Sequence, residues 1–193
     1  DMFSLPTRRD AFWESDRTGK KGITKRMVRI FAATPEFGVL VWNNVFVDRS
    51  TLNNRTILDG VNMMKKQRIV AAGGDPYSIG SVVAVYKVQA LLKSIVETIF
   101  GEDVRYTRIY LFDDRDSTPA NQRLLAIYDT DRTRSDTAVN QEVMDKQDQT
   151  LEQLITAEYY EVNTFEVQDT EARFKVVIEP YEAFLREHIT YSP

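Results

Sequence analysis

The chain has 193 residues, enough for one domain of ordinary size or for two small ones. Its 42% hydrophobic and 28% charged residues are typical of a globular protein, and its 11% aromatic residues argue against a disordered chain. The absence of cysteine excludes disulfides, thiolate nucleophiles and cysteine metal sites, and the single histidine, His188, excludes multi-histidine metal sites. No apolar run reaches the ~20 residues of a membrane helix, so we expect no membrane partner.

The net charge of −4 hides a strong asymmetry along the chain. Residues 1–70 have a net charge of +6, residues 71–130 of −2 and residues 131–193 of −8. One interpretation is that the two ends neutralise each other within one folded unit. The other is that the basic surface of one copy meets the acidic surface of the next, a head-to-tail contact that generates rings or filaments.

Residues 1–22 show no sustained hydrophobic period, and their large apolar side chains are isolated from one another. We predict an extended, irregular N-terminal arm over these residues, followed by a single α+β domain over residues 23–193. Phe12 and Trp13 are the aromatic anchors of the arm. They dock either on the chain's own body or on a neighbouring copy.

The start of the predicted domain, residues 23–48, is rich in β-branched and aromatic residues, which favour strands. We expect one strand over residues 26–33. Residues 37–47 form either a hairpin, with a two-residue turn at Asn43 and Asn44, or one unbroken strand.

Two helices are predicted next. Residues 50–72 have an approximate apolar stripe, and Gly73 supplies the end of that helix. Residues 78–100 form the clearest predicted helix, largely buried and followed by Gly101. Its apolar residues recur at spacings of three and four: Val85, Val88, Leu92, Ile95 and Ile99.

Four strands are predicted in the second half of the chain. Residues 104–114 and 123–131 form one pair, separated by a polar loop. Residues 159–168 and 173–179 form a second pair, joined by a hairpin turn across residues 169–171.

A helix is predicted between these two pairs of strands, over residues 137–158, with Ser135 or Asp136 as its cap. Pro180 begins a short last helix. Because the strands come in adjacent pairs, the sequence predicts an α+β fold. We expect a mixed or antiparallel sheet of about five to seven strands with about three to four helices packed on it.

Few residues are candidates for chemistry. No glycine-rich phosphate loop is present, and we expect no cofactor. Asp113, Asp114 and Asp116 could bind Mg²⁺ or Ca²⁺ through oxygen ligands, but the interleaved Arg115 favours surface ion pairing. His188 suits the C-terminal end of a helix better than a catalytic role.

We therefore expect a non-enzymatic structural protein that acts through protein–protein contacts, as in a phage neck, tail or capsid that forms a ring or larger assembly. Its place would be the cytoplasm or a virion, and its partners would be other subunits, as in a homo-oligomer. Phe12 and Trp13 would anchor the arm on a neighbour. The charged contacts would join Arg8, Arg9, Lys20 and Lys21 to Glu142, Asp145 and Asp148.

Two other functions stay open. The basic N-terminal segment carries aromatic residues, a mixture that neutralises phosphates and stacks on bases, so a nucleic-acid-binding accessory protein is the first alternative. The acidic overall balance speaks against a dedicated nucleic-acid binder. The second alternative is a hydrolase that holds a divalent cation on Asp113, Asp114 and Asp116.

Overall fold

The computed structural model describes residues 6–28, 35–52, 64–100, 106–130 and 134–181. The chain forms two compact units. Unit 1 comprises residues 1–25, 39–86 and 168–171, and unit 2 comprises residues 26–38, 87–167 and 172–193. The boundaries cut through single strands, so the one domain predicted over residues 23–193 stays a prediction.

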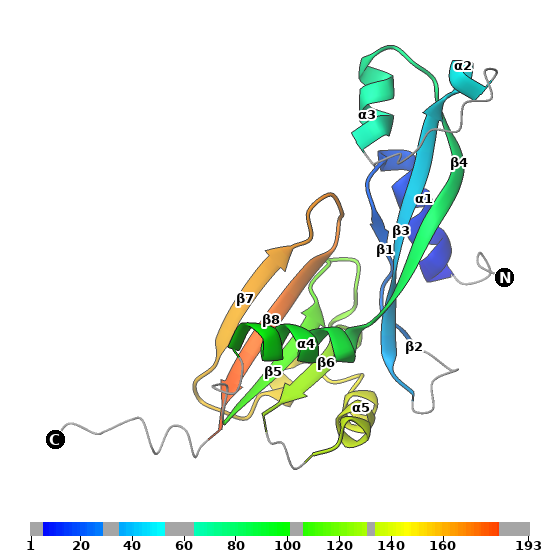
Figure 1. The fold of residues 1–193 in the computed structure, drawn as a ribbon. Coiled ribbons are helices and arrows are strands. Elements are labelled where there is room, and N and C mark those ends of the chain that lie inside the picture. The colour runs from blue at the N-terminus through cyan, green and yellow to red at the C-terminus, as the bar shows by residue number, and fades with distance from the viewer. Residues whose placement is uncertain (1–5, 29–34, 53–63, 101–105, 131–133, 182–193) are drawn as a thin grey trace. The chain divides into compact units, whose positions relative to one another are not determined.

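The first sheet is arranged around one long strand, β3. Strands β1 and β2 pair antiparallel with it, and β4 also pairs with it and runs back alongside it (Figure 1). The strands are β1 (Gly22–Ile23), β2 (Met27–Val28), β3 (Phe37–Asp48) and β4 (Pro76–Lys87). The strand predicted over residues 26–33 is β2, and residues 29–34 lie outside the described residues.

Strand β3 is unbroken, so the hairpin alternative at Asn43 and Asn44 is wrong and the single strand is confirmed. Its alternate residues explain why. Leu40, Trp42 and Asn44 are buried on one face, and a turn at Asn44 would expose this row. Asn44 Oδ1 accepts a hydrogen bond from the Ser81 hydroxyl of β4 at 2.5 Å, which satisfies its carbonyl within the sheet.

Helix α1 (Pro6–Thr18) occupies most of the predicted arm, so the extended conformation expected for residues 1–22 is wrong. Ala11 and Ser15, one turn apart, are buried, and the ring of Phe12 meets Trp42 edge-on at 5.9 Å. This buried face is made of small residues, so it gave no hydrophobic period in the sequence. The helix packs beside β1 within unit 1.

The helix predicted over residues 50–72 is described in two parts, α2 (Arg49–Leu52) and α3 (Met64–Ala71), and residues 53–63 lie outside the described residues. The predicted end is confirmed. Gly73 has a φ of +76°, a conformation that favours glycine, and its N–H donates to Val70 O at 2.9 Å. Gly74 N–H reaches back to Ile69 O at 2.8 Å, which completes a Schellman motif.

The helix predicted over residues 78–100 is only half correct. Residues up to Lys87 form strand β4, and the helix is α4 (Val88–Phe100). The N-terminal half contains the β-branched and aromatic run Val82–Tyr86, which suits a strand paired with β3. Val85 of the strand and Val88 of the helix are three residues apart, which is also the spacing of one face of a helix. The apolar residues of the strand therefore looked like a continuation of the helical pattern.

The second sheet belongs to unit 2 and is antiparallel throughout, in the order β6-β5-β8-β7. Its strands are β5 (Thr107–Asp113), β6 (Leu124–Asp129), β7 (Glu161–Glu166) and β8 (Arg173–Pro180), with a short 3₁₀ helix, η1 (Ala120–Gln122), between β5 and β6. All four predicted strands are confirmed. The predicted hairpin turn is confirmed as well, with Asp169 at a φ of +60°.

The helix predicted over residues 137–158 is two helices, α5 (Asp136–Asp145) and α6 (Leu151–Leu154). Ser135 caps α5, because its hydroxyl accepts from Ala138 N–H at 3.2 Å. Thr150 starts α6 in a capping box with Gln153. The intervening residues 146–149 are polar and give a continuous helix no apolar face to bury. Pro180, predicted to begin a short last helix, is the last residue of a strand (Arg173–Pro180), so that start is wrong, and residues 182–193 lie outside the described residues.

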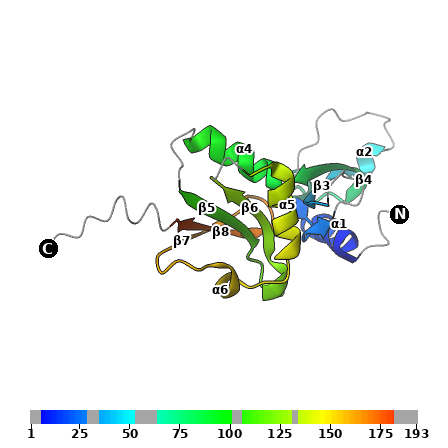
Figure 2. The same ribbon diagram turned by 90° about the horizontal axis from the view of Figure 1, so that it is seen from below.

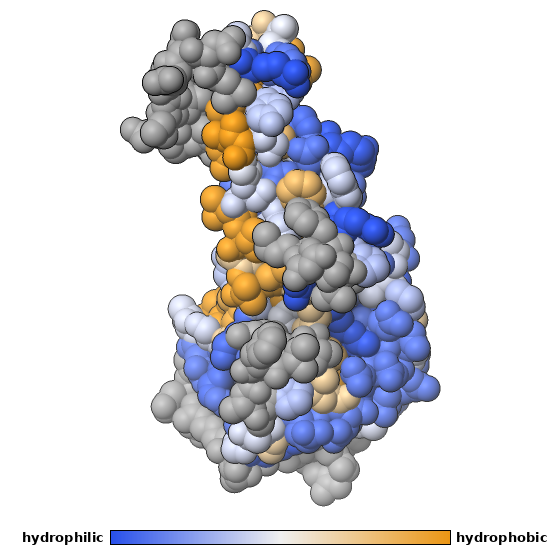
Figure 3. All heavy atoms as spheres, turned by 90° about the vertical axis from the view of Figure 1, so that its right-hand side faces the viewer, coloured by the Kyte–Doolittle hydropathy of each residue, from blue (hydrophilic) through white to orange (hydrophobic). Residues whose placement is uncertain are grey.

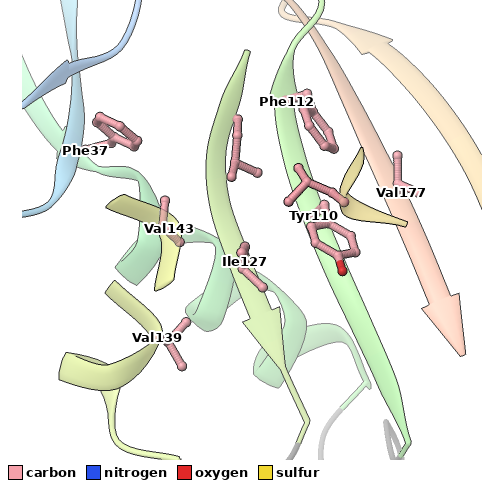
Figure 4. Close-up of a cluster of buried hydrophobic side chains, with 9 residues drawn as sticks. Phe37, Tyr110, Phe112, Ile127, Val139, Val143 and Val177 are labelled. Carbon is pink, nitrogen blue, oxygen red and sulfur yellow. The ribbon is translucent and has the colours of Figure 1, made fainter. Parts of the chain in front are cut away.

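Helices cover both faces of the second sheet, with α4 and α6 on opposite sides (Figure 2). On the face of α5 and α6, Tyr110 is fully buried and lies opposite Ile127 and Val177 in the neighbouring strands. Val139 and Val143 of α5 point toward this row (Figure 4). The fold is therefore α+β with antiparallel sheets, as predicted. No helix in the described ranges is long and apolar enough to cross a membrane.

Candidate functional site

The acidic loop after β5 is held by basic side chains of the same unit. Asp113 is almost fully buried, and Arg115 Nε donates to its Oδ1 at 2.8 Å. Asp114 contacts Lys175 Nζ at 2.9 Å and Arg173 Nε at 3.0 Å. Burial alone would raise the pKa of Asp114, but the hydrogen bond and charge of Lys175 outweigh it and hold that pKa below its ordinary value.

This geometry gives the divalent-cation hypothesis no support. Asp116 is itself bound by Arg173 at 2.9 Å, so each of the three carboxylates faces a fixed positive charge. Among the residues that the structure describes, no three or more acidic or histidine side chains form a group that could hold a metal ion. The acidic side chains of this loop form ion pairs with nearby basic side chains at the end of β5.

The acidic residues chosen for the assembly hypothesis differ in how available they are. Glu142 is bound by Arg134 at 2.6 Å and by Lys146 at 2.7 Å. Burial alone would raise the pKa of Glu142, but hydrogen bonds from Lys146 and Arg134 outweigh it and lower that pKa. Asp145 and Asp148 are on the surface, where Gln141 Nε2 donates to Asp145 at 2.8 Å and Arg26 lies 3.6 Å from Asp148.

The predicted arm residues lie on and after helix α1. Phe12 packs on Trp42 of the same unit, which favours docking on the chain's own body, whereas Trp13 is 57% exposed. Arg9 is 3.9 Å from Asp10, and Lys21 N–H donates to Asp169 O at 2.9 Å. Arg8 is half-buried and Lys20 exposed. A contact between these basic residues and the acidic residues of another copy stays a prediction.

Another buried carboxylate of unit 2, Glu179, serves the fold. Tyr110 Oη donates to its Oε2 at 2.7 Å, and the N–H groups of Thr156 and Ala157 donate to Oε1 at 2.8 and 2.9 Å. Burial alone would raise the pKa of Glu179, but these hydrogen bonds, that of Tyr110 first, lower it below its ordinary value. A carboxylate with every position occupied is a poor base for a substrate.

The surface feature without such an internal role is strand β4. Twelve residues long, it carries no charged side chain between Pro76 and Lys87. Ile79, Val82 and Val85 are exposed by 50%, 61% and 55%. Tyr77 and Tyr86 are exposed as well. Figure 3 shows a band of hydrophobic residues on the face of unit 1 that this view presents.

The backbone of β4 is open along one edge. Within the described ranges β4 pairs with β3 alone, and no backbone group of another described segment bonds to its outer edge. The outer strands of the second sheet differ from β4: β6 is covered by a side chain, and β7 is half as long as β4 and has a charged residue at each end. Gln89 of α4 bonds both backbone groups of Ile127 on β6, at 2.5 and 3.1 Å, and β7 begins and ends with glutamate.

Sequence reasoning missed β4 because it assigned these residues to a helix. The run Val82–Tyr86 was the available signal, since β-branched and aromatic residues in succession favour a strand. No model of a known protein family matches this chain, and no curated protein matches it. The candidate site is therefore defined by physical features alone. It is the long, apolar and open edge of strand β4 in an α+β protein.

Proposed function

We propose that this chain is a non-enzymatic structural protein that works by protein–protein contact, joining copies into an oligomer or larger assembly. The observation that carries the proposal is the open edge of β4 and its exposed apolar side chains. An unpaired strand edge offers a row of N–H and C=O groups to another chain, and natural proteins usually shield such edges.

The lack of protective charged side chains on β4 supports the proposal that this edge binds another chain. Charged side chains inside an edge strand are a common defence, and none occurs between Pro76 and Lys87. Exposed apolar patches that are continuous and uncharged are typical of interaction surfaces. Internal partners bind the carboxylates of Asp114, Glu142 and Glu179. These groups therefore give little support to an enzymatic role.

Light-scattering mass measured across a range of protein concentrations tests this proposal. We expect a mass above that of one chain that falls on dilution. Val82→Lys should lower the association constant at least about tenfold, because it places a charge in the apolar surface. Val70→Lys is the matched control, since Val70 is 56% exposed but lies on α3, and it should leave the mass unchanged.

Salt separates this surface from the charged arm. An interface of apolar side chains and backbone hydrogen bonds should survive high salt, whereas pairing of Arg8, Arg9, Lys20 and Lys21 with acidic residues should weaken as salt screens it. A mass equal to one chain at every concentration and salt would overturn the proposed function. A mass that Val82→Lys leaves unchanged would move the interface away from β4.

A further inference from the structure

We infer that the partner of β4 is β4 of a second copy of this chain, paired antiparallel about a two-fold axis at Ser81. The inference rests on the proposed function and names its partner and register. It follows from the charges at the two ends of the strand, from the symmetry of antiparallel pairing, and from the order of side chains along β4.

The symmetry of the pairing limits the registers. In an antiparallel pair, residues opposite each other alternate between hydrogen-bonded and non-hydrogen-bonded pairs. A two-fold axis maps each hydrogen-bonded pair onto a hydrogen-bonded pair and each non-hydrogen-bonded pair onto a non-hydrogen-bonded pair. The axis must therefore lie midway between a residue and the same residue of the partner. The axis can therefore lie at a residue, and near the middle of β4 these residues are Gly80, Ser81 and Val82, but it cannot lie between two residues.

The charges at the strand ends select one of these registers. With Ser81 on the axis, Asp75 lies opposite the partner's Lys87, and the reverse contact occurs at the other end. With Gly80 on the axis Lys87 would face the partner's Gly73, and with Val82 on the axis it would face the partner's Tyr77. Opposite charges directly across a strand pair stabilise it.

Both charged side chains have room for a second partner. Asp75 Oδ2 contacts Arg49 Nε at 2.9 Å, and Lys87 Nζ lies 3.3 Å from Glu36, yet the side chains of Asp75 and Lys87 remain 65% and 53% exposed. In the proposed pair, Asp75 would lie between Arg49 and the partner's Lys87. This arrangement extends each ion pair without breaking it.

The side chains between these ends also complement one another. The hydrogen bond from the Ser81 hydroxyl to Asn44 fixes the face on which Ser81 lies, and alternation places Tyr77, Ile79 and Val85 on the same face. About the axis at Ser81, Tyr77 lies opposite the partner's Val85, and Ile79 opposite the partner's Val83. Aromatic and β-branched residues facing each other are favourable cross-strand pairs.

The other face of β4 fits the same register. Gly80 lies opposite the partner's Val82, and a side chain at Gly80 would meet no atom within 4 Å in the free chain. The small residue leaves space for the large one. Pro76, which lacks an N–H, falls at the end of the strand, where the loss of one hydrogen bond disturbs the pairing least.

Charge reversal and mixing test the register directly. In Asp75→Lys both ends of each strand are positive, and in Lys87→Asp both are negative, so each variant alone should associate about tenfold less tightly than wild type. A mixture of the two variants has opposite charges at both ends of every mixed pair. We expect the mixture to form heterodimers with wild-type affinity, measured by light-scattering mass and by pull-down of one tagged variant with the other.

A single-cysteine variant tests the axis. The chain has no cysteine, so Ser81→Cys introduces the only thiol. Directly opposite residues lie about 4.5 to 5.5 Å apart at Cα, within the range of a disulfide, so diamide should convert this variant into a covalent dimer. Ser78→Cys is the matched control, because position 78 would lie about 20 Å from its own copy and should not cross-link.

The outcomes separate this inference from the proposed function. A multimer whose mixed charge variants associate no more tightly than either variant alone, and whose Ser81→Cys form does not cross-link, would overturn the β4 pairing and leave assembly standing. A single-chain mass for wild type at every concentration would overturn both. Heterodimers in the mixture together with the Ser81→Cys cross-link would establish the pairing and its register.

Discussion

At the scale of single residues, several buried polar side chains of unit 2 are held in hydrogen-bonded clusters. The clearest is Glu179, which accepts from Tyr110 and from two backbone N–H groups. A buried carboxylate is tolerated only where such donors replace water. Glu179 lies on β8, and its partners come from β5 and from the segment after α6, so this one side chain joins three parts of the unit.

Tyr110→Phe should measure that contribution. The variant removes the hydroxyl that donates to Glu179 and leaves the buried ring in place. We expect the free energy of unfolding to fall by about 1 to 3 kcal/mol, because a hydrogen bond to a charged group is lost in the interior. Urea denaturation is the measurement. Tyr159→Phe, on a residue that is 59% exposed, should change the value by less than about 0.5 kcal/mol.

Residues also show how far the sequence could be interpreted. The cap at Ser135, the turn at Asp169 and the helix end at Gly73 were predictable, because each depends on a few neighbouring residues. The partners of Asp114 and Glu142 were not, since they are brought together by pairing between distant strands and helices. Caps and turns can be predicted from neighbouring residues, whereas contacts between distant segments can be identified only once the fold is known.

At the scale of elements, the close approach of α1 to β1 depends on one glycine. A Cβ added at Gly22 would lie 2.1 Å from the carbonyl oxygen of Ala11, which is backbone and cannot rotate away. The helix and strand could not keep their present separation with any larger residue there. This contact shows that the helix and the strand lie backbone to backbone at this point.

Gly22→Ala should therefore destabilise unit 1 by about 1 to 3 kcal/mol, because the helix must move or the backbone must strain. Differential scanning fluorimetry and urea denaturation would report the change. Gly80→Ala, with both variants measured at a protein concentration where the chain is a single copy, is the matched control, since an added Cβ there meets nothing within 4 Å in the free chain. An equal effect from both variants would show that the loss of glycine, and not the contact with Ala11, is responsible.

The error over β4 and α4 has a cause of its own. The segment from Pro76 to Phe100 is rich in apolar residues, and an apolar run alone does not distinguish a strand from a helix. Pairing with β3 decides the conformation of its first half. Strands β5 to β8 were predictable because turns or polar loops bound them, and the boundary at Val88 has neither.

At the scale of the whole molecule, the shifted pKa values of several carboxyl groups make stability depend on pH. Asp114, Glu142 and Glu179 have pKa values in the folded protein that lie below their ordinary values. Such groups stabilise the folded state above the pKa of the unfolded chain, about 4, and this stabilisation is lost as pH falls through the lower folded values. Glu171 acts in the opposite direction, because its hydrogen bond with Glu14 raises its pKa.

Glu142→Gln should make this dependence visible. We expect lower stability than wild type at pH 7, where Arg134 and Lys146 lose a charged partner, and a smaller loss between pH 7 and pH 3. Urea midpoints at several pH values are the measurement. Glu158→Gln, on an exposed side chain, should follow the wild-type curve; a parallel shift of both variants would contradict the assignment.

The protection of β6 by Gln89 has a consequence for how far an assembly could grow. A strand edge that pairs with its own copy about a two-fold axis is used up in that contact. With β6 capped by an amide and β7 bounded by glutamates, the second sheet offers poor sites for further edge addition. The molecule would then favour closed dimers over open fibres, because the amide of Gln89 would block the addition of another strand to β6.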